Sequence, residues 1–214
     1  MRVVIAGGHG QIALLLERAL SENGDHAVGL VRNPDHVGDV EATGAEAVVL
    51  DLEHTDAETL AGVLSGADAV VFAAGGGPKS GAARKETVDK GAAILLANAA
   101  EKAGVRRYVM VSSMGADAAD PTSEDVFQVY LRAKKAADDD VRSRDLDWTV
   151  VRPGRLTDDP GTGRVTVGTL GRGQVSRADV AATLLGVLHT PSTVGATFDL
   201  LGGDTPVDEA LASL

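Results

Sequence analysis

The chain has 214 residues, a formal net charge of −11 and a sequence pI of about 4.8, with 44% hydrophobic and 24% charged residues. This composition is typical of a globular domain, and its acidity and 3% aromatic content argue against nucleic acids and membranes as partners. The absence of cysteine excludes disulfides, thiolate metal sites and a cysteine nucleophile.

The chain opens on an apolar run at Arg2–Ala6, followed at once by closely spaced glycines and then by leucines at helical spacing. This order predicts a strand, a tight turn and a helix, which together place helix N-terminal amides against a dinucleotide pyrophosphate. Gly7 would let the chain leave the strand, and Gly10 would let the backbone approach phosphates without a Cβ. A purely structural turn is the alternative. The predicted cofactor-binding residues here are Gly7, Gly8, His9, Gly10, Gln11 and Ile12.

The rest of the chain alternates strand and helix patterns. Strands are predicted over 27–31, 47–50, 69–72, 108–111, 148–152 and 197–200, with shorter β-prone pieces at 165–167 and around Val175. Helices are predicted over 59–64, 84–103 (with Gly104 as the C′ residue), 125–144, 176–189 (capped by Ser176) and from Pro206 onward. The alternation predicts an α/β fold with a doubly wound parallel sheet, a Rossmann fold. No linker is evident, so we expect a single domain over 1–214, with about 155–214 as a small substrate-side extension.

In such a sheet, ligands bind beyond the carboxyl ends of the strands. The second strand ends at Arg32 and Asn33, where an NAD-preferring fold usually has an acidic residue that holds the ribose hydroxyls. A guanidinium can instead bind a 2′-phosphate through two hydrogen bonds. We therefore predict NADP(H) as the cofactor, with a solvated surface arginine as the alternative reading of Arg32.

Two further positions near the predicted cofactor have open interpretations. Asp51, followed by Leu52, comes after the third strand and could accept from the adenine amine or simply cap the strand end. His9, inside the glycine turn, could contact a phosphate or be an exposed turn residue.

A catalytic arrangement is predicted around Tyr130 and Lys134, which are four residues apart and therefore share one helical face. A nearby ammonium favours the tyrosinate, which suits Tyr130 to donate or accept a proton, and the lysine could also bind the nicotinamide ribose. Ser113, just past the fifth strand, could orient a substrate carbonyl or hydroxyl. A chance spacing with Tyr130 packed on the sheet is the alternative.

Taken together, these residues resemble the short-chain dehydrogenase/reductase superfamily, and within it the small atypical members described as NmrA-like or epimerase/dehydratase-like. The resemblance covers nearly the whole chain. It rests on Gly7–Ala13, Leu30–Asn33, Asp51 with Leu52, Val111–Ser113, Tyr130 with Lys134, and Val150–Gly154.

The resemblance implies roles for several residues. Ser113, Tyr130 and Lys134 correspond to the superfamily's catalytic serine, tyrosine and lysine. Positions implied to pass along the cofactor are Ala73, Ala74, Gly75, Val111, Ser112, Pro153, Gly154, Arg155 and Leu156.

The chain departs from the superfamily pattern in two ways. The active-site asparagine falls on Asp89, which could hold the ammonium of Lys134 and alter the water relay, or could be a solvated helix residue. About sixty residues follow Pro153, fewer than the large substrate domain of extended members requires, so a shallow, open substrate pocket is expected and an epimerase is less favoured.

Other charged groups are assigned no site. The five histidines lack metal-ligand spacing, so no metal is predicted. The acidic run Asp138–Asp140 is interpreted as a solvated helix face. Arg155 and Arg172 could meet an acidic substrate or cofactor, with surface arginines as the simpler reading.

The sequence thus predicts an NADP(H)-dependent oxidoreductase acting on a small carbonyl, hydroxyl or quinone-like substrate. A regulatory protein that senses NADP(H) without turnover, favoured by Asp89 and the short C-terminal region, and an epimerase or isomerase are the alternatives. We expect a cytoplasmic location, because the chain starts directly on a core strand and no apolar run is long enough to span a membrane. A homodimer and a monomer are both compatible with the sequence.

Overall fold

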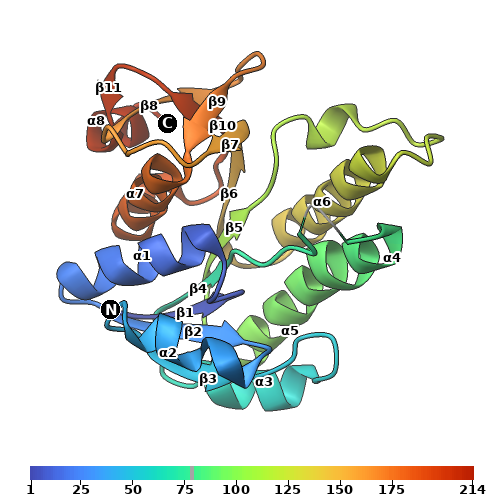
Figure 1. Ribbon diagram of the computed structural model, residues 1–214, viewed down its shortest axis with the longest axis vertical. Helices are drawn as coiled ribbons and strands as arrows, with labels where there is room; N and C mark the ends of the chain where they lie inside the picture. The colour runs from blue at the N-terminus through green and yellow to red at the C-terminus, as the bar shows by residue number, and fades with distance from the viewer. Residues whose placement is uncertain (78–79) are drawn as a thin grey trace.

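The computed structural model describes residues 1–77 and 80–214 and is built around one nine-stranded sheet, seen edge-on in Figure 1. The strand order is β11-β8-β10-β6-β5-β4-β1-β2-β3. Seven strands run parallel, and β8 is antiparallel to its neighbours β10 and β11. The strands are β1 (Arg2–Ala6), β2 (His26–Val31), β3 (Glu46–Val49), β4 (Ala69–Phe72), β5 (Arg107–Val111), β6 (Asp147–Pro153), β8 (Arg164–Gly168), β10 (Thr197–Gly202) and β11 (Thr205–Pro206).

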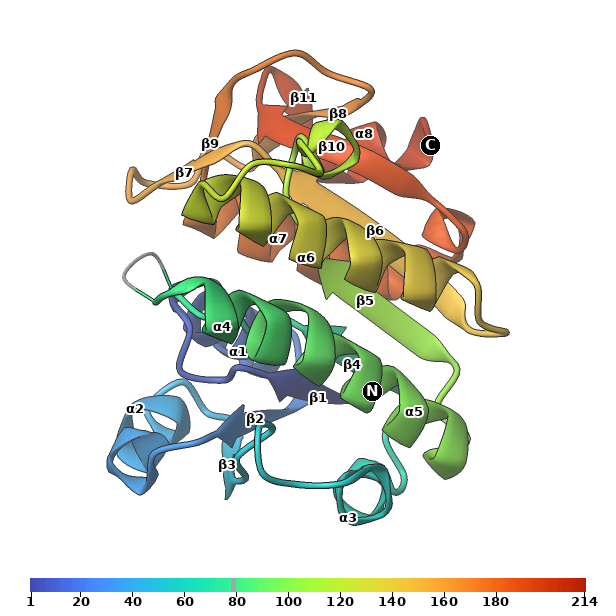
Figure 2. The ribbon, with the colours of Figure 1, turned by 90° about the vertical axis from the view of Figure 1, so that its right-hand side faces the viewer.

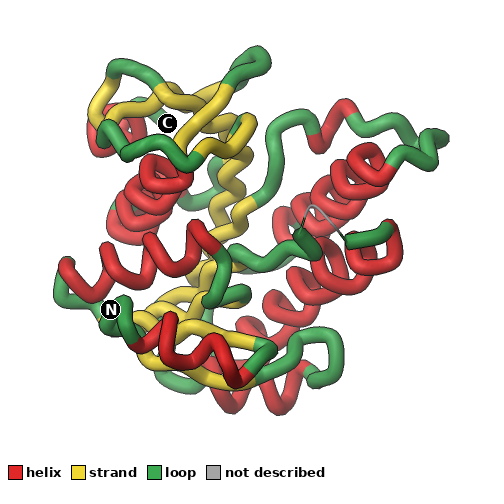
Figure 3. The backbone as a smooth tube through the Cα atoms, in the orientation of Figure 1, coloured by secondary structure: helices red, strands yellow, loops and turns green. Residues whose placement is uncertain are grey.

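Helices cover both faces of this sheet, so the strands lie between two helical layers (Figure 3). One face carries α1 (Gln11–Glu22), α2 (Val37–Glu41), α7 (Arg177–His189) and α8 (Val207–Ala212). The other carries α3 (Ala57–Leu64), α4 (Ala82–Arg84), η2 (Lys85–Ala92), α5 (Ala93–Ala103) and α6 (Val126–Arg142), of which α4 to α6 cross the face shown in Figure 2. Short 3₁₀ turns are η1 (Pro34–His36), η3 (Ala116–Ala118) and η4 (Pro191–Thr193). This confirms the predicted doubly wound Rossmann fold.

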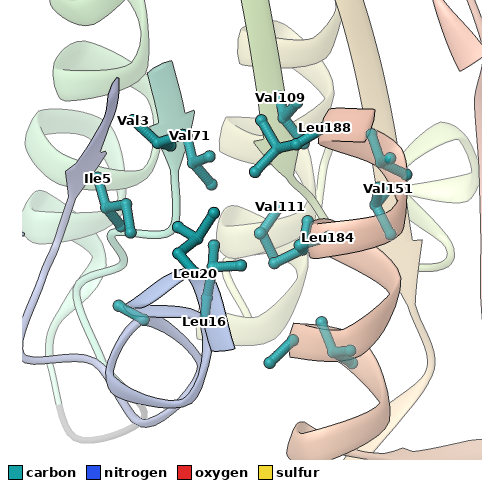
Figure 4. Packing of buried hydrophobic residues seen from close by; sticks show 14 of the residues in the cluster. Val3, Ile5, Leu16, Leu20, Val71, Val109, Val111, Val151, Leu184 and Leu188 are labelled. Carbon is teal, nitrogen blue, oxygen red and sulfur yellow. The ribbon is translucent and has the colours of Figure 1, made fainter. Parts of the chain in front are cut away.

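Each face of the sheet has its own hydrophobic core because successive strand residues point to opposite faces. In β1, Val3 and Ile5 pack on the layer of α1 and α7, as Figure 4 shows, whereas Val4 packs on the layer of α3 and α5. All three side chains are fully buried. Burial on both faces explains why the central strands read as continuous apolar runs.

The direction in which successive strands are added to the sheet reverses between β1 and β4, which are parallel neighbours. From β1 the chain proceeds to β2 and β3 on one side, and from β4 to β5 and β6 on the other. A doubly wound sheet opens a crevice at this reversal, beyond the carboxyl ends of the strands. The crevice falls at the glycine turn after β1.

The structure departs from the predicted elements in a few places. Residues after Asn33, where no regular pattern was evident, form η1 and α2, and residues 85–92 of the predicted long helix are π-helical. The strand β6 includes Pro153 as its last residue instead of ending before it. Gly104 follows the helix with φ of 72°, the left-handed conformation expected at C′.

The C-terminal region continues the sheet beyond β6. Strands β10, β8 and β11 extend it, and a separate parallel pair joins β7 (Arg155–Thr157) to β9 (Gln174–Ser176). Ser176 accepts a hydrogen bond from the Asp179 backbone N–H and caps α7, as predicted. Across the residues that the structure describes, no helix combines the length and apolarity needed to cross a membrane.

Candidate cofactor and active site

The glycine turn between β1 and α1 packs directly against the end of β4. Gly7 has φ of +85°, and a Cβ at this position would lie 2.6 Å from the Cα of Ala74. A Cβ on Gly8 would lie 2.7 Å from the Cα of Gly29, in β2. Both positions therefore require glycine for close backbone packing, and Gly7 also for its backbone conformation.

The turn delivers the N-terminus of α1 to the crevice. Gly10 is the N-cap residue and has no side chain to accept from the first turn. The first N–H groups of a helix have no intrahelical partner, so those of Gln11, Ile12 and Ala13 are available to an anion. The geometry of this turn fits the pyrophosphate of a dinucleotide.

A cavity of about 310 Å³ lies next to the turn. It is bounded by the carboxyl ends of the first four strands, at the strand-order reversal. Of the residues predicted to hold the cofactor, it is lined by Gly7, His9, Gly10, Arg32, Asn33, Asp51, Leu52, Ala73, Ala74 and Gly75. The cavity therefore gathers residues that are far apart in sequence into one pocket of the kind that holds the adenosine end of a dinucleotide.

The arginine at the end of β2 is paired with an acidic residue that the sequence did not single out. Arg32 Nη1 lies 3.2 Å from Glu53 Oε2, and Arg84 Nη2 lies 2.8 Å from the same oxygen. Thr87 donates to the other carboxylate oxygen at 2.7 Å. The hydrogen bonds from Thr87 and Arg84 hold the pKa of Glu53 below its usual value. All but Thr87 line the cavity, so its rim carries two guanidiniums and one carboxylate.

Asp51 caps the turn after β3. Its Oδ1 accepts from the Glu53 backbone N–H at 3.0 Å, and its Oδ2 lies 2.9 Å from His54 Nδ1. Burial raises the pKa of Asp51, but these hydrogen bonds outweigh it and leave the pKa below its usual value. The carboxylate therefore serves the turn and also faces the cavity.

His9, in the glycine turn, stacks on His36 with ring centroids 3.5 Å apart. Its Nε2 lies 2.8 Å from Asp39 Oδ2 in α2. Both histidine rings line the cavity, and Asp39 fixes the orientation of His9. The contact ties the glycine turn to the segment that follows Arg32.

Beyond this cavity, Tyr130 and Lys134 lie together on α6. Lys134 Nζ donates to the Val111 carbonyl at 3.1 Å and lies 5.2 Å from the centroid of the Phe72 ring. The ammonium thus reaches the carboxyl ends of β4 and β5. It also lies 5.9 Å from the Tyr130 ring centroid, so the structure brings the predicted tyrosine and lysine into one place.

Asp89 is buried beside this pair and is not a solvated helix residue. It is 1% exposed, and its Oδ1 lies 3.6 Å from Lys134 Nζ. Its Oδ2 accepts from the Gly76 backbone N–H at 3.0 Å, in the glycine-rich segment after β4. A Cβ on Gly75 would lie 3.0 Å from Oδ1, so the segment lies directly over the carboxylate.

A second buried lysine, which the sequence reasoning missed, completes this cluster. Lys85 donates to the Gly77 carbonyl at 2.8 Å and lies 3.9 Å from Asp89 Oδ2. Its Nζ is 5.2 Å from the centroid of the Tyr130 ring. Its spacing of four residues from Asp89 was the available sequence signal. The π-helical turn of η2 carries both residues, and such turns are frequent at functional sites.

The serines after β5 have different surroundings. Ser113 Oγ donates to the Met114 carbonyl at 3.3 Å, and no hydrogen bond joins it to Tyr130 or Lys134 within the described part of the chain. Ser112 is buried and donates to Asp138 Oδ2 at 2.8 Å. Of the three residues predicted at the catalytic centre, Tyr130 and Lys134 therefore lie together, and Ser113 makes no hydrogen bond to either of them within the described part of the chain.

The interpretation of Asp138–Asp140 as a wholly solvated helix face is wrong for Asp138. This carboxylate is fully buried and accepts from both Ser112 and Arg152 Nε, the latter at 3.0 Å. Burial raises its pKa, against the hydrogen bonds from Ser112 and Arg152. Arg152 also donates to Asp117, so a polar chain runs from the end of β5 to the loop before α6. A buried polar chain of this kind has no sequence periodicity.

The hydrogen-bonded side chains Arg152 and Asp117 line a second cavity, of about 540 Å³. It lies over β6 and β10 and is lined by residues of both charges. Its lining includes Met114, Asp117, Arg142, Arg152, Arg172 and Asp199. Arg172 thus faces a cavity, although not the one at the glycine turn.

The segment after β6 is built into the C-terminal region. Gly154 N–H donates to the Leu200 carbonyl at 3.0 Å, and Arg155 N–H to the Gly173 carbonyl at 2.9 Å. A Cβ on Gly154 would lie 2.6 Å from the Gly173 oxygen. Pro153, Gly154, Arg155 and Leu156 are absent from the lining of the cavity at the glycine turn. The cofactor contacts of this segment therefore stay a prediction.

With this geometry in place, comparison with known proteins gives the family. A family model described as NAD(P)H-binding matches residues 7–191. The chain belongs to this NAD(P)H-binding family. The match confirms the resemblance inferred from the sequence and explains the glycine turn, the uncapped helix and the adjoining cavity together.

Individual members of the NAD(P)H-binding family are similar over the full chain. The chain is 38% identical over 216 residues to the Bacillus subtilis (strain 168) protein "Uncharacterized sugar epimerase YhfK", and the match covers 100% of both chains. A solved structure, "Putative NAD-dependent epimerase/dehydratase from Bacillus halodurans", is 36% identical with a TM-score of 0.93 and 100% of both chains covered. The oxidoreductase ylbE from Lactococcus lactis is 29% identical, with a TM-score of 0.89 over 100% of this chain and 96% of that one.

Among residues 1–77 and 80–214, no group of three or more histidine, aspartate or glutamate side chains has an arrangement that could hold a metal ion.

Proposed function

We propose that the protein is an NADP(H)-dependent oxidoreductase that transfers hydride to or from a small carbonyl, hydroxyl or quinone-like substrate. The observation that carries the proposal is the placement of Tyr130 against buried Lys134, at the carboxyl ends of β4 and β5. A dinucleotide that begins at the glycine turn and follows the crevice would bring its nicotinamide to this place.

The cofactor residues divide along the crevice. The amides at the start of α1 would bind the pyrophosphate, the cavity would hold the adenosine, and Arg32 with Asn33 would bind the 2′-phosphate. The segment over Asp89, at Gly75–Gly77, would pass along the phosphates and ribose. The bound cofactor supplies the hydride, which the side chains of the protein cannot.

Tyr130 would exchange the proton that accompanies hydride transfer. Its side chain is half-buried on α6, with the Lys134 ammonium 5.9 Å from the ring centroid, and a phenol is a group that can act in general acid–base catalysis. Lys134 is fixed by the Val111 carbonyl and by Asp89, so its charge cannot rotate away. Ser113 would reach the substrate oxygen after turning from the Met114 carbonyl.

The substrate side is supported by an exposed aromatic ring. Phe127 is 58% exposed, one turn before Tyr130, and its ring centroid lies 5.9 Å from that of Tyr130. An exposed apolar ring next to a proton donor suits a flat, conjugated carbonyl or quinone. We infer that residues 155–214 form the remaining substrate side within a single domain.

The test is oxidation of NADPH with a panel of carbonyl, quinone and flavin substrates, comparing wild type with Tyr130→Phe. We expect at least about a 100-fold loss of kcat in the variant, because general acid–base catalysis is worth about that much or more, with NADPH binding retained. Tyr108→Phe is the matched control, because Tyr108 is buried in the core and donates to the Ala93 carbonyl, away from the site. Its kcat should equal that of wild type.

Two other outcomes identify the alternatives. The names of the Bacillus relatives favour an epimerase, for which the substrate is isomerised with no net change in NADPH. Tight NADPH binding, with no turnover of any panel member and no isomerisation, favours the regulatory sensor. Equal activity of wild type and Tyr130→Phe would contradict the proposal.

A further inference from the structure

Two arginine side chains from different parts of the fold meet at one carboxylate oxygen. Arg32 follows β2, and Arg84 is the last residue of α4, in the segment after β4. Arg32 Nη1 and Arg84 Nη2 lie 3.2 Å and 2.8 Å, respectively, from Glu53 Oε2. All three residues line the cavity beside the glycine turn. The two guanidinium groups therefore converge on a single point at the rim of this cavity.

Both guanidinium groups keep unused hydrogen-bond donors. An arginine side chain presents five N–H donors in a planar fork and has no acceptor. Among residues 1–77 and 80–214, Glu53 is the one acceptor for the side chains of Arg32 and Arg84. Within the same residues, Arg84 Nε is buried and has no hydrogen-bond partner. A buried donor without an acceptor is costly, so this rim is short of acceptor oxygens.

The carboxylates of the rim are themselves held by other groups. Glu53 Oε1 accepts from Thr87 at 2.7 Å, which fixes the carboxylate between the arginines. Asp51, the other acidic residue that lines the cavity, accepts from the Glu53 backbone N–H and lies 2.9 Å from His54 Nδ1. A phosphate monoester carries nearly two negative charges and three strong acceptor oxygens. It would therefore supply the acceptors that a single carboxylate oxygen does not.

We infer that Arg84 determines cofactor specificity together with Arg32, and that the two guanidinium groups bind the 2′-phosphate of NADP(H) between them. Glu53 Oε2 marks the point where a phosphate oxygen would meet both groups. The inference rests on the proposed binding of NADP(H), in which this phosphate was assigned to Arg32 and Asn33, and it adds a residue from the segment after β4. Two planar forks give a directed grip on phosphate that a lysine or a neutral side chain does not.

A purely structural role for Arg84 makes a different prediction. Arg84 and Thr87 belong to one segment, and both donate to Glu53, so they also tie this segment to the turn after β3. Loss of this tie would lower the free energy of unfolding and would weaken the binding of every nucleotide that uses the cavity by a similar factor. Loss of a phosphate contact would weaken only the binding of nucleotides that carry a 2′-phosphate. The two roles are therefore separated by comparing nucleotides that differ in this group alone.

The experiment measures the dissociation constants of 2′,5′-ADP and 5′-AMP by titration calorimetry, with circular dichroism to show that each variant is folded. Arg84→Met should weaken the binding of 2′,5′-ADP by about tenfold or more, because a charge-assisted hydrogen bond to phosphate is lost, and that of 5′-AMP by less than about threefold. Arg84→Lys keeps the charge without the fork and should lose less than Arg84→Met. Thr87→Val, the matched control, removes a neutral contact of Glu53 and should leave the ratio of the two dissociation constants unchanged.

An equal loss for both nucleotides would overturn the inference, as would an Arg84→Met variant that keeps its affinity for 2′,5′-ADP when Arg32→Ala has lost it. A wild-type chain that binds 2′,5′-ADP no more tightly than 5′-AMP would overturn the choice of NADP(H) itself, and the inference with it. If Arg84→Met fails to fold, Arg84→Gln supplies the same comparison. Because the titration needs no turnover, a chain that binds NADP(H) without catalysis still shows the loss, so failure of the proposed hydride transfer is distinguishable.

Discussion

Arg32 donates to Glu53 at the rim of the cavity beside the glycine turn, with Nη1 3.2 Å from Oε2. The residue that we propose to bind a 2′-phosphate therefore shares one carboxylate oxygen with Arg84, which lies 2.8 Å from it. If NADP(H) is the cofactor, its 2′-phosphate would compete with the Glu53 carboxylate for the Arg32 guanidinium.

Arg32→Ala should weaken NADPH binding by about tenfold or more, because a charge-assisted contact to phosphate is worth about 1.5–3 kcal/mol. NADH, which has no 2′-phosphate, should lose less than about threefold. Titration calorimetry with each cofactor measures both. The matched control is Arg18→Ala, an exposed arginine of α1 outside the cavity, which should change neither affinity. Equal losses for NADPH and NADH would contradict a role in 2′-phosphate recognition.

Glu53→Gln should strengthen NADPH binding relative to NADH, by about threefold to tenfold. The substitution removes the charge that competes for Arg32 and also frees Arg84, without removing side-chain volume. The ratio of the two dissociation constants is the quantity to measure. A ratio that moves toward NADH would show instead that Glu53 binds the ribose hydroxyls of NAD.

Gly7→Ala should lower the free energy of unfolding by about 1–3 kcal/mol and abolish detectable NADPH binding. The added Cβ meets the Ala74 backbone at 2.6 Å, and φ of +85° is costly for alanine. Denaturant unfolding and cofactor titration report the two effects. Gly38→Ala, in α2 with no atom within 4 Å of the added Cβ, should be neutral or slightly stabilising. A Gly7→Ala chain as stable as Gly38→Ala would contradict the packing account.

Glu17 gives a pH dependence of stability. It is fully buried beneath the glycine turn, where burial raises its pKa to about 8, against a weak hydrogen bond from Thr43. In the unfolded chain it ionises near 4.5, so the unfolded state loses its proton first as pH rises. The free energy of unfolding therefore falls between these two pH values and the loss is complete above the higher one.

Glu17→Gln stays neutral at every pH. Its free energy of unfolding should equal that of wild type at acidic pH and exceed it at alkaline pH by up to about 4 kcal/mol. Urea unfolding at several pH values measures this difference. Glu22→Gln, an exposed position on the same helix, is the control and should show no such trend. A stability gain for Glu17→Gln that is constant with pH would exclude ionisation of Glu17 as its cause.

Arg152→Met should lower the free energy of unfolding by about 3–5 kcal/mol, because it leaves the fully buried Asp138 without its cation. Adding Asp138→Asn to this variant should recover most of the loss, since the neutral amide can still accept from Ser112. Arg172→Met, at an exposed arginine of the second cavity, should stay within about 0.5 kcal/mol of wild type. If the double variant is no more stable than Arg152→Met, the loss of stability comes from lost packing of the arginine side chain and not from an unpaired Asp138.

Much of the fold was predictable because its signals are local. A strand buried on both faces is a continuous apolar run, and the predicted strand over 69–72 coincides with β4. The glycine turn was recognisable from spacing alone, and Ser176 from its position before α7. The π-helical turn at Lys85–Ala92 was missed because the same apolar spacing is compatible with an ordinary helix.

The site residues that could not be predicted from the sequence are those whose hydrogen-bond partners lie far away along the chain. Glu53 lines the cavity beside the glycine turn together with Arg32 and Arg84, which are 21 and 31 residues away in the sequence. Asp138 reads as part of an acidic surface run until Arg152 and Ser112 are placed beside it. Side-chain charge alone does not indicate whether a residue is solvated or buried with a partner.

Asp89 is bonded to the Gly76 backbone through one oxygen and lies next to Lys134 through the other. A ligand bound on the glycine-rich segment would lie against the same carboxylate that contacts Lys134. Thermodynamic reciprocity then applies: if this ligand changes how a second molecule binds beside Lys134, the second molecule changes the affinity for the first by the same factor. The two ends of the crevice would be coupled through one buried side chain.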